Sequence, residues 1–422
     1  MTQLEYARKG IITPQMKTAA RREGASAETV RKEVAAGRAV IAANSRHKNL
    51  VPVVIGRRFG CKINANLGNS GFSTHGGEIK KLLLAVEWGA DAVMDLSTSG
   101  DLRKLRRAFV RRSPVPVGTV PVYEALLRAG TVEAITPELL LQVIREHAED
   151  GVDFMTVHAG ILRKHIPFAK TRVMGIVSRG GAILAKWMSH RRSENPLYTH
   201  FTDICRIFRE YDVTFSLGDA LRPGCLADAC DRAQYAELET LGELVAVSRK
   251  SGAQAMVEGP GHVPLDQIPG TVKKALRVCH DAPFYVLGPL VTDIAAGYDH
   301  INAAIGAAQA ARHGASFLCY VTPKEHVGFP DCEDVRQGIM ALRTAAHAAD
   351  IARGLEGARR RDDEMSKARY AMDWKRQFAL ALDPGRAREY RFQTITETVS
   401  NHCAMCGPKF CSVKNSREAC GR

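Results

Sequence analysis

The sequence lacks any long apolar run: no part of it approaches the roughly 20 apolar residues that a membrane-spanning helix needs. Its first six residues contain no apolar stretch of the kind that a secretory signal carries, so we expect a cytoplasmic protein. The 11 cysteines are odd in number and scattered, which gives no disulfide framework and indicates a reducing compartment. With 45% apolar and 25% charged residues, the composition is that of a globular protein.

The net charge of +14 raises the question of nucleic-acid binding. The densest basic run is residues 102–112, in which Leu102, Leu105 and Phe109 recur at helical spacing. We therefore expect an amphipathic helix whose basic residues lie on the solvent-exposed face. No recognised nucleic-acid motif accompanies this run, so attraction for phosphorylated metabolites is favoured over nucleic acid.

From residue 61 onward, short apolar and β-branched runs alternate with helix-like segments. The strand-like runs are residues 62–66, 92–96, 117–123, 153–158, 213–219, 255–259, 284–288 and 317–321, with residues 175–180 as a ninth candidate, strand or loop. One intervening helix is well delimited, with Thr136 as N-cap, Pro137 in the first turn and Gly151 after its end. This alternation predicts an α/β fold with a (β/α)₈ barrel. A doubly wound sheet is the alternative, but no Gly-rich dinucleotide turn follows the first strand.

The pattern suggests four regions along the chain. Residues 1–60 form a small N-terminal α/β segment, and residues 61–332 form the catalytic barrel. Residues 333–398 are predominantly helical in pattern, and residues 399–422 form a cysteine-containing tail. No low-complexity stretch or internal repeat interrupts these regions.

Polar residues gather where the predicted strands end. They are Asn66, Asp95, Tyr123, His158, Asp219, Glu258, His262, Tyr285 and His326. In a barrel the carboxyl ends of all strands face one rim, where barrel enzymes have their active sites. So many polar residues at one rim favour an active site over isolated capping residues.

The tail places three thiols, Cys403, Cys406 and Cys411, within nine residues. Thiolates are soft ligands that suit iron–sulfur clusters, zinc or copper(I). Three thiolates leave one metal position open, whereas a structural site usually has four ligands. His402 could complete a Cys₃His zinc site on a binding module, although a ligand adjacent to Cys403 is awkwardly spaced.

Two further sites are indicated within the barrel. His262 and His326 each follow a strand on a Pro-containing turn, where two imidazoles could hold zinc or iron(II) and leave positions for substrate or water. Residues 178–181 (SRGG) and 219–224 (DALRPG) place an arginine beside glycines, as anion sites do. Neither pattern alone identifies a site, because ordinary turns and capping histidines have the same sequence pattern.

Several segments closely resemble the phosphomethylpyrimidine synthase (ThiC) family of radical S-adenosylmethionine (SAM) enzymes. They are NANLG (64–68), MDLST (94–98), GTVPVY (118–123), HAG (158–160), IVSRGG (176–181), EGPGH (258–262), GYDH (297–300) and the C-x₂-C-x₄-C tail. The resemblance spans almost the whole chain. It implies a lyase that rearranges 5-aminoimidazole ribotide to 4-amino-5-hydroxymethyl-2-methylpyrimidine phosphate, the thiamin pyrimidine, with release of formate and carbon monoxide.

The resemblance also implies the site residues. The [4Fe–4S] cluster would be held by Cys403, Cys406 and Cys411, and would donate an electron to SAM. Zinc, or Fe²⁺, would be held by His262 and His326. Substrate contacts would be Asn66, Met94, Tyr123, His158, Ser178, Arg179, Gly180, Asp219, Ala220, Leu221, Arg222, Glu258 and Tyr285. A homodimer is implied, in which one subunit's tail covers the other's barrel, together with an electron donor such as flavodoxin or ferredoxin.

Three positions depart from the family's usual pattern. Ala296 and Ala43 stand where proline is usual, and Ala220 replaces a common glycine. None of these changes removes a ligand or a charged group. They leave the product open, because a close relative of the family converts the same substrate to 5-hydroxybenzimidazole for anaerobic cobalamin synthesis.

Overall fold

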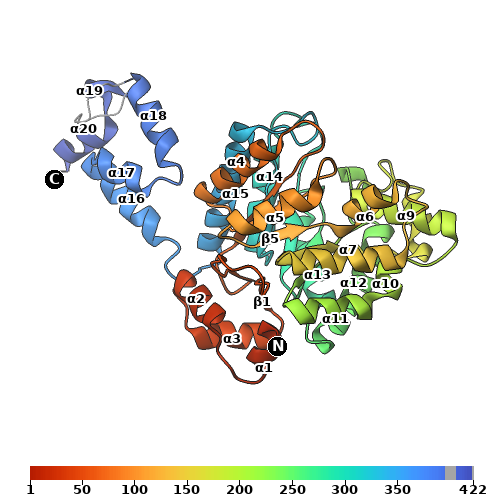
Figure 1. The fold of residues 1–422 in the computed structure, drawn as a ribbon. Coiled ribbons are helices and arrows are strands. Elements are labelled where there is room, and N and C mark those ends of the chain that lie inside the picture. Colours follow the sequence, from red (N-terminus) through yellow and green to blue (C-terminus); the bar gives the residue numbers. More distant parts are fainter. Residues whose placement is uncertain (395–404, 421–422) are drawn as a thin grey trace. The chain divides into compact units, whose positions relative to one another are not determined.

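The structure is a computed structural model, and it describes residues 1–394 and 405–420. The chain forms two compact units, Met1–Ala352 and Arg353–Arg422, each of which is described by itself. The first unit contains the N-terminal segment and the barrel (Figure 1). None of the helices in the described ranges has both the length and the apolarity that crossing a membrane would require.

Eight parallel strands close into a barrel in the order β10-β3-β4-β5-β6-β7-β8-β9. The strands are β3 (Lys62–Leu67), β4 (Ala92–Asp95), β5 (Val117–Thr119), β6 (Phe154–Val157), β7 (Thr214–Leu217), β8 (Ala255–Gly259), β9 (Phe284–Leu287) and β10 (Phe317–Cys319). Closure is made by β10, in which Phe317 lies opposite Tyr285 of β9 and Lys62 of β3. The closed sheet confirms the predicted barrel and excludes the doubly wound alternative, which would have two open edges.

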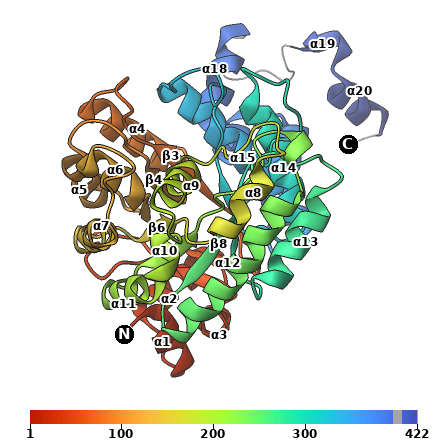
Figure 2. The same ribbon diagram turned by 90° about the vertical axis from the view of Figure 1, so that its right-hand side faces the viewer.

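Helices ring the barrel and bury the outer faces of its strands (Figure 2). The longer ones are α4 (His75–Glu87), α5 (Leu102–Arg112), α6 (Pro121–Ala129), α7 (Pro137–Glu149), α9 (Arg179–Arg191), α11 (Phe201–Tyr211), α12 (Arg232–Lys250), α13 (Ile268–Val278), α14 (Asp299–Arg312) and α15 (Cys332–Ala352). Short turns of helix are η1 (Arg163–His165), α8 (Ile166–Ala169), α10 (Pro196–Thr199) and η2 (Leu226–Asp228). The start of α7 is as predicted: Thr136 accepts a hydrogen bond from the N–H of Leu139, and Pro137 follows it.

Two of the strand predictions need correction. The run 117–123 is a strand only over Val117–Thr119, because Pro121 begins α6; proline has no N–H to donate to a neighbouring strand and suits the first helical turn. The ninth candidate, residues 175–180, is not a strand. It is a loop that leads into α9, where the Ser178 hydroxyl accepts the N–H of Gly181 as N-cap.

The N-terminal segment has a small core of its own and is fixed to the barrel by hydrogen bonds. It comprises α1 (Gln3–Arg8), α2 (Pro14–Glu23), α3 (Ala27–Ala35) and the antiparallel pair β1 (Ala39–Ile41) and β2 (Val54–Gly56). The Gln254 carboxamide both accepts from the N–H and donates to the carbonyl of Ile41, at 2.8 and 2.9 Å. The Thr2 hydroxyl donates to the Gly252 carbonyl at 2.6 Å. Partners far apart in the sequence therefore hold this segment in place.

The second unit is helical where it is described. Its helices are α16 (Arg360–Ala371), α17 (Trp374–Leu380), α18 (Pro384–Thr394), α19 (Gly407–Phe410) and α20 (Ser412–Ala419). The predicted division of the chain into four domains, with boundaries near residues 60, 332 and 398, stays a prediction.

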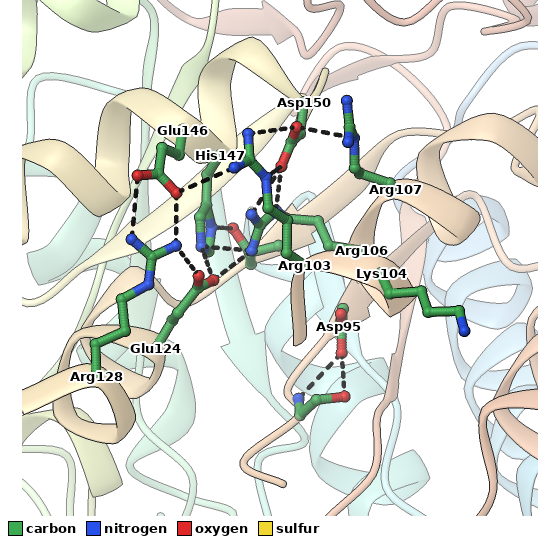
Figure 3. A network of polar contacts seen from close by, with 12 residues as sticks. Asp95, Arg103, Lys104, Arg106, Arg107, Glu124, Arg128, Glu146, His147 and Asp150 are labelled. Carbon is green, nitrogen blue, oxygen red and sulfur yellow. Dashed lines mark hydrogen bonds and ion pairs between the residues drawn. The ribbon is translucent and has the colours of Figure 1, made fainter. Parts of the chain in front are cut away.

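The basic run on α5 is not simply a solvated face. Arg106 is 1% exposed, and its guanidinium pairs with Glu124 of α6. It also pairs with Asp150, which follows α7, at 2.7 Å. Arg103 and Arg107 also pair with Asp150, at 3.3 and 3.2 Å. These residues, with Arg128, Glu146 and His147, form what we call the α5–α7 ion network (Figure 3). The expectation of exposed basic residues is therefore wrong for Arg106, because acidic groups from two other helices converge on it.

We expect Arg106→Met to lower the free energy of unfolding by about 3 kcal/mol, because it leaves Glu124 and Asp150 buried without their shared cation. Lys104→Met is the matched control, since Lys104 is exposed on the same helix and points away from the network (Figure 3). Chemical denaturation of both variants measures the difference. Equal stabilities would contradict the role assigned to the network.

Candidate active site

A cavity that is open to solvent at its mouth lies at the carboxyl ends of the barrel strands. Most of the expected substrate contacts line it, namely Asn66, Met94, Tyr123, His158, Arg179, Asp219, Arg222, Glu258 and Tyr285. Parallel strands bring these residues together although they are spread from residue 66 to residue 285. Six of the nine polar residues predicted at the rim thus share one cavity, as expected at this end of a barrel, whereas Asp95, His262 and His326 do not line it. Asp95 instead accepts hydrogen bonds from the N–H and the hydroxyl of Ser97.

The cationic side of the cavity is formed by Arg179 and Arg222. Arg179 is the first residue of α9, and its guanidinium carbon lies 5.1 Å from the centre of the Tyr123 ring, over its face. Burial raises the pKa of the Tyr123 hydroxyl, so the ring stays neutral beneath the arginine. The N-terminus of α9 opens toward the same group of residues, which gives this side of the cavity the character of an anion site.

His158 packs directly against the start of α9. Its Nε2 lies 3.2 Å from the Ser178 hydroxyl, and its Nδ1 is buried without a hydrogen-bond partner in the described part of the chain. Burial lowers the pKa of His158 to about 3, which keeps the imidazole neutral. A Cβ atom on Gly180 would lie 2.4 Å from the His158 ring. Glycine is therefore required for α9 to approach the strand ends so closely.

The carboxyl groups of the cavity belong to Asp219 and Glu258, which form what we call its acidic side. One oxygen of Glu258 accepts hydrogen bonds from the Thr156 and Ser216 hydroxyls, both at 2.7 Å, and burial raises the pKa of this carboxyl. Burial raises the pKa of Asp219 to about 8, although Arg222 lies 3.1 Å away and opposes the shift. The second oxygen of Asp219 has no hydrogen-bond partner among the described residues. Both acids therefore have acceptor capacity left for a ligand.

The floor of the cavity is a cluster that the sequence reasoning found only in part. The Asn64 carboxamide donates to the Asn66 side chain and to the Tyr285 hydroxyl, each at 2.8 Å. The Asn66 side chain donates in turn to the Cys319 sulfur at 3.0 Å, and burial raises the pKa of that thiol to about 12. Asn64 and Cys319 were missed, as were Thr156 and Glu325, which also line the cavity. The signal was available for Asn64 and Thr156, which stand two positions from predicted residues and so share their strand face.

Four expected contacts do not line the cavity with their side chains. Ser178 and Gly180 shape the start of α9, as described above. The N–H groups of Ala220 and Leu221 point away from the cavity and donate to Glu237 of α12, at 2.9 and 2.6 Å. The structure therefore brings these four residues to the border of the cavity rather than into it.

The two histidines expected to bind a metal lie side by side. Their ring centres are 5.5 Å apart, and each Nδ1 faces a carboxylate: His262 faces Asp293 at 2.8 Å, and His326 faces Asp299 at 3.1 Å. Each Nε2 is left without a partner in the described ranges. Carboxylates that orient imidazoles in this way are the usual outer partners of metal-binding histidines. Among the described residues, no group of three His, Cys, Asp or Glu side chains is placed to hold a metal ion, so a metal on this pair would need further ligands from elsewhere.

Two of the three tail thiols can be placed. Cys406 immediately precedes the short helix α19, and Cys411 follows it. Cys411 is 2% exposed. Cys403, the third expected cluster ligand, lies outside the described residues. A pair of thiols around one helical turn fits the donor set of an iron–sulfur cluster.

A closed parallel barrel with a charged cavity at its carboxyl-terminal rim, joined to a cysteine tail, defines a metal-dependent barrel enzyme for a small polar substrate. Residues 2–418 match the model of the radical SAM ThiC family, and the chain belongs to that family. As a radical SAM enzyme, it uses SAM and an iron–sulfur cluster.

The chain is 58% identical over 423 aligned positions to the phosphomethylpyrimidine synthase of Haloarcula marismortui. The alignment covers 99% of this chain and 88% of that protein. Among solved structures it is similar to a dihydropteroate synthase from Coxiella burnetii, with 12% identity and a TM-score of 0.40 over 69% of this chain and 94% of the other. A dihydropteroate synthase from Thermus thermophilus has 12% identity and a TM-score of 0.39 over 68% and 93%. These two distant likenesses add nothing to the topology described above.

The raised pKa of Asp219 predicts a pH-dependent stability. The folded pKa of about 8 exceeds the ordinary value of 3.8, so this group stabilises the fold below pH 4, and its contribution is lost as pH rises toward 8. Asp219→Asn cannot ionise, and we expect its stability relative to the unchanged chain to rise between pH 4 and pH 8 by up to about 1 kcal/mol per pH unit.

Thermal denaturation across this pH range measures the effect. Asp266→Asn is the control, because Asp266 is exposed on the surface and should show no such trend. A stability difference for Asp219→Asn that does not change with pH would contradict the assignment.

Proposed function

We propose that this chain rearranges 5-aminoimidazole ribotide to 4-amino-5-hydroxymethyl-2-methylpyrimidine phosphate, with release of formate and carbon monoxide, in thiamin biosynthesis. The observation that carries the proposal is 58% identity, over 99% of the chain, to a phosphomethylpyrimidine synthase. The cavity supports it, because a ribotide has a phosphate at one end and a polar aminoimidazole at the other. The arginine side and the acidic side of the cavity match these two ends.

The phosphate end would lie against the start of α9. Arg179 and Arg222 supply guanidinium groups, which match phosphate geometry with paired N–H donors. The absence of a side chain at Gly180 lets the start of α9 come close to the cavity, where the positive end of the helix dipole would favour an anion. The neutral His158 beside them adds no charge of its own.

The aminoimidazole and ribose would lie against the acids and the floor of the cavity. Glu258, fixed by the Thr156 and Ser216 hydroxyls, and Asp219 accept hydrogen bonds from the amine and hydroxyl groups of the substrate. Asn66 and Tyr285, which Asn64 holds together, orient the ring. These residues would bind and orient the substrate, while Cys403, Cys406 and Cys411 would hold the iron–sulfur cluster, which would supply the electron for reductive cleavage of SAM.

We also propose a zinc ion, or Fe²⁺, at His262 and His326. The carboxylates of Asp293 and Asp299 support this site, since they fix both rings through Nδ1 and leave both Nε2 atoms for the metal. Burial lowers the pKa of His262, which favours the neutral imidazole that metals bind. A homodimer and a small electron-donor protein such as flavodoxin or ferredoxin complete the proposal, on the basis of the family resemblance.

Anaerobic incubation of the reconstituted, reduced protein with 5-aminoimidazole ribotide and SAM tests the reaction. We expect the phosphorylated pyrimidine by mass spectrometry. Cys406→Ala should abolish the product, whereas Cys420→Ala, outside the three-thiol motif, should leave it unchanged. Fluorescent 5-hydroxybenzimidazole as the product would refute the proposed reaction in favour of the related enzyme.

Metal analysis tests the histidine site separately from the reaction. We expect one zinc per chain in the unchanged protein and none in His262→Ala, with the iron content of the two proteins equal. Asp293→Asn should weaken zinc binding by about 10- to 100-fold, because it removes the group that orients His262. His313→Ala, which alters an exposed histidine, is the control. Full zinc content in His262→Ala would rule out the site.

A further inference from the structure

The segment 219–222 carries two of the charged cavity residues, Asp219 and Arg222, but contains no regular secondary structure. It lies between the end of β7 and the start of α12. A loop of this kind needs partners for its backbone groups if its side chains are to keep one orientation. Two buried residues outside the cavity provide these partners.

Glu237 binds the N–H side of the segment. It lies in the second turn of α12 and is 2% exposed. Its two carboxylate oxygens accept the N–H groups of Ala220 and Leu221, one each, at 2.9 and 2.6 Å. Because both bonds go to one planar group, they fix the direction of the peptide units between Asp219 and Arg222.

Arg172 binds the carbonyl side of the same segment. Its side chain is 1% exposed, and it donates to the Leu221 carbonyl at 2.7 Å and to the Arg222 carbonyl at 3.3 Å. The guanidinium is itself held by two bonds of 2.7 Å to Asp231, the N-cap residue of α12. An arginine held in this two-pronged way has little freedom to move.

Arg172 also connects the segment 219–222 to the phosphate side of the cavity. It stands in the loop that leads to Ser178 and α9, and donates to the Gly175 carbonyl of that loop at 3.4 Å. The two segments touch directly as well, since a Cβ atom on Gly181 would lie 2.6 Å from the Ala220 carbonyl. One guanidinium thus joins the two backbone segments that carry the cationic groups of the cavity.

We propose that Arg172 and Glu237 are positioning residues, which orient Asp219 and Arg222 toward the substrate by fixing the backbone between them. Neither residue lines the substrate cavity itself; Glu237 lines a smaller hollow that shares Asp219, Arg222 and Glu258 with it. The inference rests on the proposed function, because it takes a ribotide as the ligand of the cavity. It adds two residues to the binding machinery that the sequence motifs did not indicate.

Calorimetric titration with 5-aminoimidazole ribotide, without reductant or SAM, tests this role through binding alone. We expect Arg172→Met and Glu237→Gln each to raise the Kd by about tenfold or more, because the binding groups lose their fixed orientation. The control is Arg31→Met, which breaks an arginine–carboxylate pair with Glu28 and a bond to the Ala7 carbonyl, far from the cavity in the sequence. Arg31→Met should leave the Kd unchanged.

A double-variant cycle separates positioning from general destabilisation. If Arg172 acts through Arg222, its substitution costs less affinity in an Arg222→Met background than in the unchanged chain, because the two effects are coupled. Additive losses would overturn the proposal. Melting temperatures are recorded alongside, and Glu237→Gln, which keeps the volume of the side chain, decides the question if Arg172→Met does not fold.

The results distinguish a failure of the proposed function from a failure of the positioning role. An unchanged protein that does not bind the ribotide would overturn both the proposed function and this inference. Tight binding by the unchanged protein together with equal Kd values for the variants would overturn only the positioning role. A lower melting temperature with an unchanged Kd would likewise show that Arg172 and Glu237 serve stability alone.

Discussion

The pairing of β10 with β3 is the contact on which the rest of the structure depends. It closes eight parallel strands, so the groups that follow each strand face one enclosed volume instead of spreading along an open edge. Enclosure takes these groups out of water, and burial is the leading cause of the raised pKa values of Asp219 and Glu258 and of the lowered pKa of His158. The topology and the electrostatics of the site therefore have a common origin.

Desolvation also explains why the cavity is supported so heavily from outside. A buried charged group turns toward any available partner unless other groups hold it, and the arginines and the acids of the cavity are close enough to pair, as Arg222 and Asp219 do. The Thr156 and Ser216 hydroxyls restrain Glu258, and the backbone bonds to Glu237 and Arg172 restrain the segment 219–222. These restraints keep the arginines and the acids of the cavity apart, so that each remains available to a ligand that is itself charged at one end.

The barrel and most of the cavity could be predicted from the sequence because both follow from a local pattern, an apolar run that ends in a polar residue. The pattern failed where a tertiary partner decided the outcome. Pro121 turned the end of one run into a helix, and Arg106 was buried by acids from α6 and α7. Glu237 gave no signal at all, because a glutamate in an amphipathic helix looks the same whether it meets water or a loop backbone. The cluster ligands came from the family resemblance, and one of them, Cys403, lies outside the described residues.

The bonds of the N-terminal segment bear on the order in which the chain folds as it is synthesised. Thr2 finds its partner in Gly252, and Ile41 finds its partner in Gln254, so these contacts form only after 250 and 213 further residues, respectively, have been synthesised. The apolar faces of α2 and α3 pack into a small core that α1, β1 and β2 share, so the barrel is not needed to cover them. Docking of this segment therefore has to wait until residues 252–254 have been synthesised, although its own core can form earlier.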